Sequence, residues 1–192
     1  SDGKPFKTRE GGTKPLKELF KETYEYIEKI NNDLDESIVS QLTNSVLTYS
    51  DLITNRKTDY KFDLEKFTNV NGKTGIYVQY SQVRAKKLLE NIATKNSKLN
   101  NFILNDVDKE LLSKLYLFTY FLEQSAVLNE PHHLANYLYE ISNLFNQFYE
   151  SEKISEIEDT EQLSSKIYIT NLFLTTSQNV MWCLGITPAN QM

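Results

Sequence analysis

Apolar residues recur at intervals of three and four positions along most of the chain, which is the spacing of one face of an α-helix. Polar and charged residues fill the positions between them. This pattern predicts helices over residues 16–30, 35–50, 74–93, 111–122, 131–148 and 161–184, with a short segment at 62–67. The alternating pattern of a strand does not compete with them. The sequence therefore predicts an all-α fold, a helical bundle.

The clearest amphipathic pattern follows Asn129-Glu130-Pro131. Proline is favoured in the first turn of a helix, where its missing N–H has no partner to lose. The apolar face that follows runs over four turns and comprises Leu134, Tyr137, Leu138, Ile141, Leu144, Phe145 and Phe148. The last predicted helix has apolar residues on more than one face, so we expect it to be largely buried. Gly185 and Pro188 predict its end.

Residues 73–87 carry an unusual pattern on the helix surface. One stripe of this helix can face a core; it comprises Val78, Ala85, Leu89 and Ile92. Thr74 is a candidate N-cap. Tyr77, Tyr80 and Arg84 follow at i, i+3 and i+7, about a third of a turn from the apolar stripe. Two aromatic faces and a guanidinium can stack and hydrogen-bond an unpaired base. The alternative is that both tyrosines pack at the rim of the core, which is the commoner outcome of such spacing alone.

The composition is that of a folded chain, because 40% of its 192 residues are hydrophobic and it contains 12 Tyr, 10 Phe, only 6 Gly and 4 Pro. No run of about 18 apolar residues predicts a membrane helix, and the first residues lack the apolar core of a signal peptide. The single cysteine, Cys183, cannot form an internal disulfide. These features favour a soluble protein of the cytoplasm.

The net charge of −5 argues against a basic nucleic-acid-binding domain as a whole, but the charges are unevenly distributed. Between residues 84 and 98 the cations outnumber the single acid, Glu90; they are Arg84, Lys86, Lys87, Lys95 and Lys98. Residues 150–161 are strongly acidic. A basic strip on an acidic body could contact phosphates, although such a run is more often a solvated face.

Catalytic and metal-binding patterns are weak. His132 and His133 are adjacent, so they cannot share a helix face as paired metal ligands do, and the sequence predicts no metal site. Cys183 lies in an apolar segment and is more consistent with a core thiol than with a nucleophile. The sequence therefore does not assemble a complete active site.

Several short motifs occur in a familiar order. Residues 5–13, Pro-Phe-Lys-Thr-Arg-Glu-Gly-Gly-Thr, read as a loop from inside a longer protein, and residues 74–84 read Thr-Gly-Ile-Tyr-Val-Gln-Tyr-Ser-Gln-Val-Arg. Glu130-Pro-His132, Tyr137-Leu-Tyr139 and Leu184-Gly-Ile-Thr-Pro188 follow, and the chain ends in Met192. Together these motifs resemble arginyl-tRNA synthetases of the bacterial type over essentially the whole chain. The first motif resembles the family's variant of the KMSKS loop.

The resemblance implies a carboxyl-terminal portion of such an enzyme. It implies that residues 1–13 end the catalytic domain, 14–58 form connecting helices and 59–192 form the anticodon-binding helical bundle. The full-length enzyme would use ATP with Mg²⁺ to attach arginine to tRNA-Arg. This chain alone is expected to need no cofactor and to be inactive, because the nucleotide-binding sheet and HIGH motif of the class are missing from it. We also expect a monomer without a membrane partner.

The resemblance also implies site residues. The ATP loop would comprise Phe6, Lys7, Thr8, Arg9, Gly11 and Gly12. The surface for the anticodon loop would comprise Tyr77, Tyr80, Arg84, Tyr149 and Met192, with Lys86 and Lys87 added by the charge pattern. The chain departs from the family where Ile76 replaces a usual proline. The alternative hypothesis is a helical protein–protein interaction module whose exposed tyrosines contact a partner protein without any role for nucleic acid.

Overall fold

Helices and their connections make up the whole of the described structure, a computed structural model that describes residues 14–30, 33–60, 62–92 and 101–192. In chain order they are α1 (Leu16–Ile30), α2 (Glu36–Leu52), α3 (Leu64–Phe67), α4 (Gly75–Ile92), α5 (Asp106–Leu115), α6 (Phe118–Leu128), α7 (His132–Ser151), the 3₁₀ turn η2 (Ile154–Glu156) and α8 (Thr160–Cys183). The prediction of an all-α fold is confirmed. Among the described residues, no helix is both long and apolar enough to cross a membrane.

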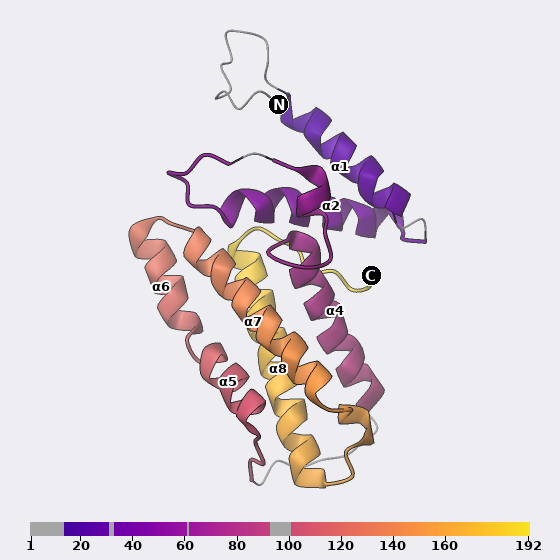
Figure 1. Cartoon of the computed structure of the whole chain (residues 1–192), viewed down its shortest axis with the longest axis vertical. Helices are drawn as coiled ribbons and strands as arrows, with labels where there is room; N and C mark the ends of the chain where they lie inside the picture. The colour runs from indigo at the N-terminus through magenta and orange to yellow at the C-terminus, as the bar shows by residue number, and fades with distance from the viewer. Residues whose placement is uncertain (1–13, 31–32, 61, 93–100) are drawn as a thin grey trace.

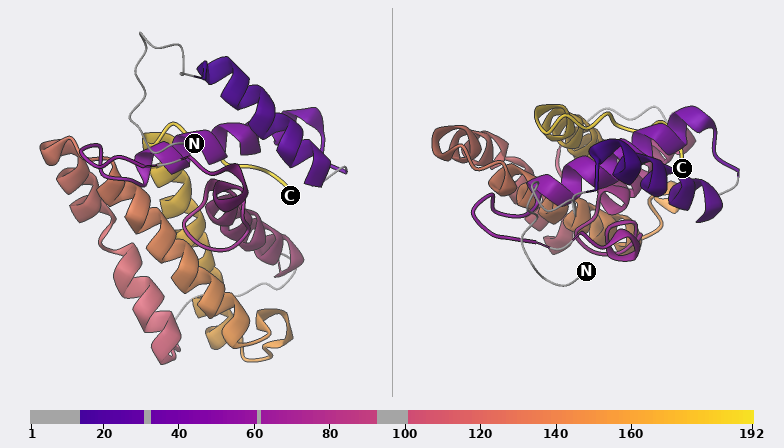
Figure 2. Two further views of the ribbon diagram at one scale, coloured as in Figure 1. Left: turned by 45° about the horizontal axis from the view of Figure 1, so that its top comes forward. Right: turned by 90° about the horizontal axis from the view of Figure 1, so that it is seen from above.

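The helices form a bundle with a cap at one end. Helices α4, α7 and α8 run along the long axis with α5 and α6 beside them, and α2 crosses the end of this bundle beneath α1 (Figure 1). Figure 2 shows α1 and α2 from above, lying over the bundle's end. The carboxyl terminus also lies at this end, beside α4 (Figure 1).

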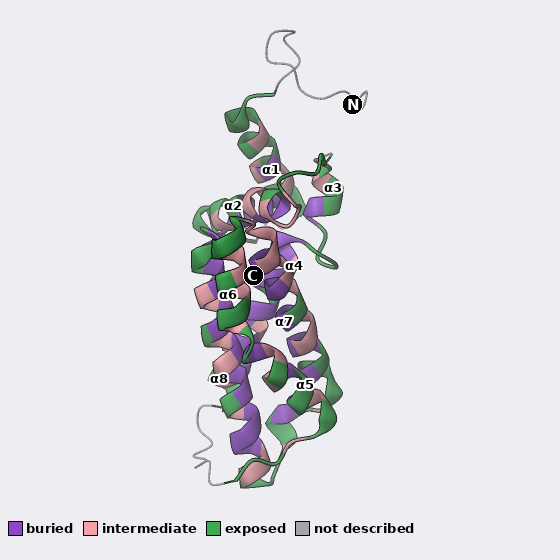
Figure 3. Ribbon diagram, turned by 90° about the vertical axis from the view of Figure 1, so that its left-hand side faces the viewer, coloured by how far each residue is buried: buried purple, intermediate pink, exposed green. Residues whose placement is uncertain are grey.

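The main core lies between α4, α5, α7 and α8, whose inward faces are buried (Figure 3). Its centre is the predicted face of α7, on which every residue is buried except the half-buried Leu144. Phe145 stacks on Phe173 of α8 with 4.1 Å between the ring centroids and 5° between the planes. Because aromatic rings bury large areas in fixed geometry, this pair sets the register of α7 against α8.

A second, smaller core joins α1, α2 and α3 to the start of α4. It comprises Ile27, Ile38, Val39, Leu42, Val46, Phe67 and Ile76. Ile76, at the position where the family resemblance implies proline, is only 5% exposed. The larger side chain therefore serves as a packing residue between the cap and the bundle.

One predicted helix is divided in the structure. The spacing of Leu111, Leu115, Phe118 and Leu122 predicts a single helix, which is wrong because α5 ends at Leu115 and α6 begins at Phe118. Tertiary contacts explain the break. The hydroxyl of Tyr137 donates to the carbonyl oxygens of Lys114 and Leu115 at 3.2 Å and 3.1 Å, and its ring stacks on Phe121 of α6. A buried tyrosine thus satisfies carbonyl groups that the helix end leaves without intrahelical partners.

Candidate nucleic-acid interface

The start of α4 fixes the direction in which its aromatic face points. The hydroxyl of Thr74 donates to the carbonyl of Asn69 at 2.6 Å and accepts the backbone N–H of Tyr77 at 3.1 Å, so Thr74 acts as the predicted cap. Gly75 lies against α2, where a Cβ would stand 2.3 Å from the carbonyl oxygen of Ser45. This close approach seats the first turn of α4 on α2.

Arg84 is the centre of the face that the sequence singles out. Its guanidinium carbon lies 4.6 Å from the ring centroid of Tyr80 and 4.7 Å from that of Tyr149. Nη2 donates to the Tyr80 hydroxyl at 2.7 Å, and Nη1 donates to Asn146 and Glu150, each at 3.0 Å. The structure therefore brings together three predicted residues, and the arginine joins two tyrosines from different helices.

These contacts also favour the charged form of the guanidinium, which arginine retains at neutral pH. Burial alone would lower the pKa of Arg84, but the hydrogen bonds with Tyr80 and Glu150 outweigh burial and raise it. The Arg84 side chain is only 17% exposed, whereas Glu150 is 67% exposed. The arginine is consequently a fixed cation, and its charge is offset by an acid on the rim.

Tyr77 lies one turn before Tyr80 and belongs to the same face. Its hydroxyl donates to Asn143 Oδ1 at 3.3 Å, and its ring centroid lies 5.5 Å from that of Tyr139. Burial raises the pKa of Tyr77, so its hydroxyl stays protonated as a hydrogen-bond donor at neutral pH. The face thus extends along both α4 and α7.

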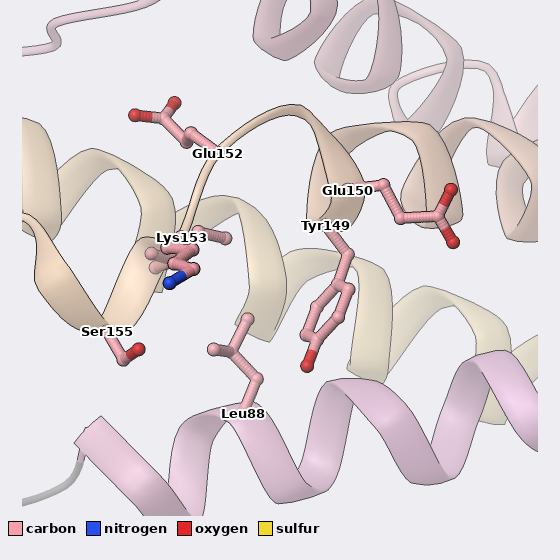
Figure 4. Close-up of a pocket in the computed structure, with 7 residues that line it drawn as sticks. Leu88, Tyr149, Glu150, Glu152, Lys153 and Ser155 are labelled. Atoms are coloured by element: carbon pink, nitrogen blue, oxygen red, sulfur yellow. The ribbon is translucent and has the colours of Figure 1, made fainter.

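A pocket of about 330 Å³ opens beside Tyr149. It is lined by Leu88, Tyr149, Glu150, Glu152, Lys153, Ile154 and Ser155. Figure 4 shows the ring of Tyr149 and the side chain of Leu88 projecting toward one another across the space between α7 and α4. The pocket leaves room beside the ring, and Tyr149 itself is 37% exposed.

The other predicted contact residues, apart from Lys87 at i+3, do not lie on the Arg84 side of α4. Lys86 lies two positions further along α4, which is about 200° around the helix, and donates to Asn190 of the carboxyl-terminal segment at 3.0 Å. Lys87 is exposed, and Met192 packs against the second core. Within the described residues the predicted basic strip is therefore divided between different sides of α4. Lys95 and Lys98 lie outside the described residues, as do Phe6, Lys7, Thr8, Arg9, Gly11 and Gly12.

The polar residues of α7 were missed by the sequence argument. Asn143, Asn146 and Glu150 each form a hydrogen bond with a side chain of α4. The sequence analysis used only the apolar face of their helix. Their signal is present in the sequence, since Asn136, Tyr139, Asn143, Asn146 and Glu150 fall within about 80° of arc on a helix of 3.6 residues per turn. A polar stripe this narrow beside an apolar face indicates a partly buried interface.

Gln79 was missed as well. Its amide donates to Ser45 and to the Thr187 carbonyl, both at 2.8 Å, and its oxygen accepts the N–H of Ala189 at 2.8 Å. It lies between Tyr77 and Tyr80 in sequence but points to another side of α4. Gln79 therefore anchors the carboxyl-terminal segment to the helix that presents the tyrosines.

Glu130, His132 and His133 form a small cluster at the start of α7. Each offers a potential metal-ligand atom, and these atoms lie within 4.8 Å of one another. The Lys57 ammonium lies 3.0 Å from the Glu130 carboxylate, and the two imidazole rings lie 4.1 Å apart. The premise that the adjacent histidines cannot come together is wrong, because both lie at the helix start beside Glu130. No observation tests metal binding, so the absence of a metal site stays a prediction.

Comparison with known proteins identifies the domain family and relatives of this chain. Residues 78–192 match the model of the DALR anticodon binding domain. The chain is 34% identical to the arginine–tRNA ligase of Francisella tularensis subsp. novicida, over 86% of this chain and 30% of that protein. It is also 34% identical to the arginine–tRNA ligase of Alkaliphilus oremlandii, over 100% of this chain and 34% of that protein. The chain thus spans about a third of the length of these relatives.

Two solved structures share the fold. The arginyl-tRNA synthetase of Thermus thermophilus superposes with a TM-score of 0.86 at 20% identity, covering 95% of this chain and 33% of that one. The arginyl-tRNA synthetase of Plasmodium falciparum gives a TM-score of 0.77 at 24% identity, covering 92% of this chain and 33% of that one. Because the domain model matches residues 78–192, more than half of the chain, the chain belongs to the family of the DALR anticodon-binding domain, in the form found in the carboxyl-terminal region of arginyl-tRNA synthetases.

Proposed function

We propose that the face formed by Tyr77, Tyr80, Arg84 and Tyr149 binds the anticodon loop of tRNA-Arg. The observation that supports this most directly is the arginine-linked pair of partly exposed rings, Tyr80 at 41% and Tyr149 at 37% exposure, on a domain of an anticodon-binding family. Stacking of an unpaired base on an aromatic side chain contributes about 1–3 kcal/mol. Two such rings would together contribute about 2–6 kcal/mol to the binding of a single-stranded loop.

The contacts of Arg84 refine the way in which a base would bind. The guanidinium lies against both rings, so a base stacks on the ring surface that remains exposed and does not enter between ring and arginine. The pocket beside Tyr149 offers that space. Arg84 then acts mainly by holding the two tyrosines in position. Lys86 and Lys87 of α4 and Met192 of the carboxyl-terminal segment remain proposed contacts of the same RNA.

We extend the proposal to the longer protein of which this chain would be a part. Residues 1–13 would end a catalytic domain, 14–58 would connect, and 59–192 would form the anticodon-binding bundle. The whole enzyme would ligate arginine to tRNA in the cytoplasm with ATP and Mg²⁺, its ATP loop including residues 6–12, and would act as a monomer. Because the relatives are about three times longer, we expect no ATP–pyrophosphate exchange from this chain alone.

The test is a binding titration of this chain with the anticodon stem-loop of tRNA-Arg, the same stem-loop with a changed anticodon, and a different tRNA. Tyr80→Ala should weaken binding of the first RNA about 5- to 100-fold. Tyr120→Ala is the matched control, since Tyr120 is 54% exposed on α6. Equal, weak binding of all three RNAs, or equal effects of the two substitutions, would contradict the proposal.

One observation favours the second candidate, a protein-interaction module. Helix α6 contains no buried residue, and its neighbourhood exposes large apolar side chains: Tyr116, Leu117, Tyr120, Val127 and Leu128. Exposed apolar patches often contact other proteins. The same titration separates the candidates, because a protein-interaction module would not distinguish between the RNAs.

A further inference from the structure

The opposite end of the α4–α7 face repeats the combination of aromatic ring, cation and amide. The Lys73 ammonium lies 5.5 Å from the ring centroid of Tyr139 and donates to Asn136 Oδ1 at 2.7 Å. The ring of Tyr77 lies 5.5 Å from that of Tyr139 and connects this group to the Arg84 end. The two ends therefore share one continuous row of side chains.

Lys73 contacts α7 from the turn that precedes α4. Gly72 has a φ of +91°, a conformation that favours glycine, in the turn that precedes α4. Helices α4 and α7 lie side by side (Figure 1), so Lys73 pairs with Asn136 near the start of α7 and Arg84 pairs with Asn146 near its end. The order of the pairs shows that the two helices run parallel.

The two cations differ in their surroundings. Arg84 is paired with the carboxylate of Glu150 at 3.0 Å. Lys73 is exposed, and among the described residues no carboxylate lies within ion-pair distance of it; its partner is the neutral amide of Asn136. An exposed ammonium whose partner is a neutral amide is available to a phosphate group, which a compact lysine cation binds as a point charge.

The length of the row fits a short stretch of nucleic acid. Asn136 and Asn146 are ten residues apart on α7, which is about 15 Å along the helix axis. Stacked bases rise about 3.4 Å per nucleotide, so about five stacked nucleotides, with four steps between them, would cover this distance. We infer that Lys73 and Tyr139 form a second nucleotide subsite on this face, in which a base stacks on the part of the half-buried Tyr139 ring that Lys73 and Tyr77 leave exposed, and Lys73 contacts the adjoining phosphate. This inference rests on the proposed function.

The test uses this chain and the anticodon stem-loop of tRNA-Arg, with binding measured across a series of salt concentrations. Lys73→Met should reduce the slope of log K against log salt by about 0.7, the value expected for one phosphate of a single strand. Tyr139→Leu should weaken binding about 5-fold or more without changing the slope. Lys66→Met is the matched control for the lysine, because the Lys66 ammonium lies 5.9 Å from the ring centroid of Phe67 on α3. Tyr120→Leu is the control for the tyrosine.

The outcomes separate this inference from the function on which it rests. If wild type binds the stem-loop selectively and Tyr80→Ala weakens it, but Lys73→Met and Tyr139→Leu behave like their controls, the second subsite is refuted and the proposed function stands. If wild type does not bind selectively, both are refuted. Thermal unfolding of each variant shows whether it is folded. Should Tyr139→Leu unfold, the slope of Lys73→Met alone decides.

Discussion

The ammonium nitrogen of Lys166 lies 2.7 Å and 2.9 Å from the two carboxylate oxygens of Asp108, and the side chains are 0% and 1% exposed. Glu152 makes a second ion pair with the same lysine, and the ring centroid of Phe148 lies 5.1 Å from it. Asp108 also accepts the backbone N–H of Asn105 at the start of α5. One buried cation therefore joins α8 to the beginning of α5 and the end of α7.

Replacing Lys166 with methionine should lower the free energy of unfolding by about 3–5 kcal/mol, because it leaves the buried carboxylate of Asp108 without a counter-ion. Urea denaturation followed by circular dichroism measures the change. Lys109→Met is the matched control: Lys109 pairs with the exposed Asp106 at 3.1 Å, and such pairs contribute less than about 1 kcal/mol. A loss below about 1 kcal/mol for Lys166→Met would show that the buried pair is not needed.

Gly75→Ala should destabilise the protein although alanine is the better helix former. A Cβ on Gly75 would lie 2.3 Å from the Ser45 carbonyl oxygen and 2.9 Å from the Val46 nitrogen, both backbone atoms of α2. Overpacking of this kind costs about 1–3 kcal/mol, more than the roughly 1 kcal/mol that helix propensity would contribute. A melting temperature equal to or above that of wild type would contradict this contact.

Gly72→Ala separates crowding from backbone strain. At Gly72 nothing lies within 4 Å of the position of a Cβ, but φ is +91°. We expect a loss of about 1 kcal/mol from strain alone. The two glycines, three positions apart, should thus respond to the same substitution for different physical reasons.

The features that could be predicted from the sequence are those that depend on local pattern. The apolar face of α7, the cap at Thr74 and the helix end at Gly185, whose φ is +72°, each follow from neighbouring residues. The alignment of Tyr77, Tyr80 and Arg84 on one side of α4 could also be predicted, because helical spacing alone places these side chains together. The family resemblance is the basis of the proposed function of that row, because spacing alone favours packing at the rim of the core.

The features that could not be predicted depend on contacts between distant segments. The break after α5 follows from Tyr137 of α7, and the burial of Lys166 follows from Asp108, 58 positions away. A lysine in an amphipathic sequence is expected at the surface. Only the fold shows that Lys166 is buried between Asp108 and Glu152. Helical spacing predicts that Arg84 lies one turn beyond Tyr80. The contact of Arg84 with a second ring, that of Tyr149 on α7, depends on the packing of two helices and could not be predicted from spacing.

The stability of the protein should fall as the pH decreases from 7 to 5 because of His132. Burial, and then the neighbouring His133, lowers the pKa of His132 from its ordinary value of 6.5. The unfolded chain therefore takes up this proton at a higher pH than the folded protein does, and stability is lost as the pH falls below about 6.5. Glu130, whose pKa is lowered mainly by its hydrogen bond with Lys57, titrates below this range.

Urea midpoints at pH 7.5 and 5.5 measure this effect. His132→Asn should reduce the difference between the two midpoints. His133→Asn is the comparison, and it should preserve most of the difference, because burial is the larger cause of the shift in His132. Equal pH dependence in wild type and His132→Asn would show that another group is responsible.

Arg84→Lys tests whether the arginine positions the tyrosines or contacts phosphate. Lysine retains the charge but lacks the planar group that lies against Tyr80 and Tyr149 and donates to three side chains. We expect about ten-fold weaker binding of the anticodon stem-loop, since a cation–aromatic contact contributes about 0.5–2 kcal/mol. Because the charge is kept, the salt dependence of binding should not change. Arg56→Lys, at an exposed position, is the control; unaltered affinity of Arg84→Lys would leave the arginine without the positioning role.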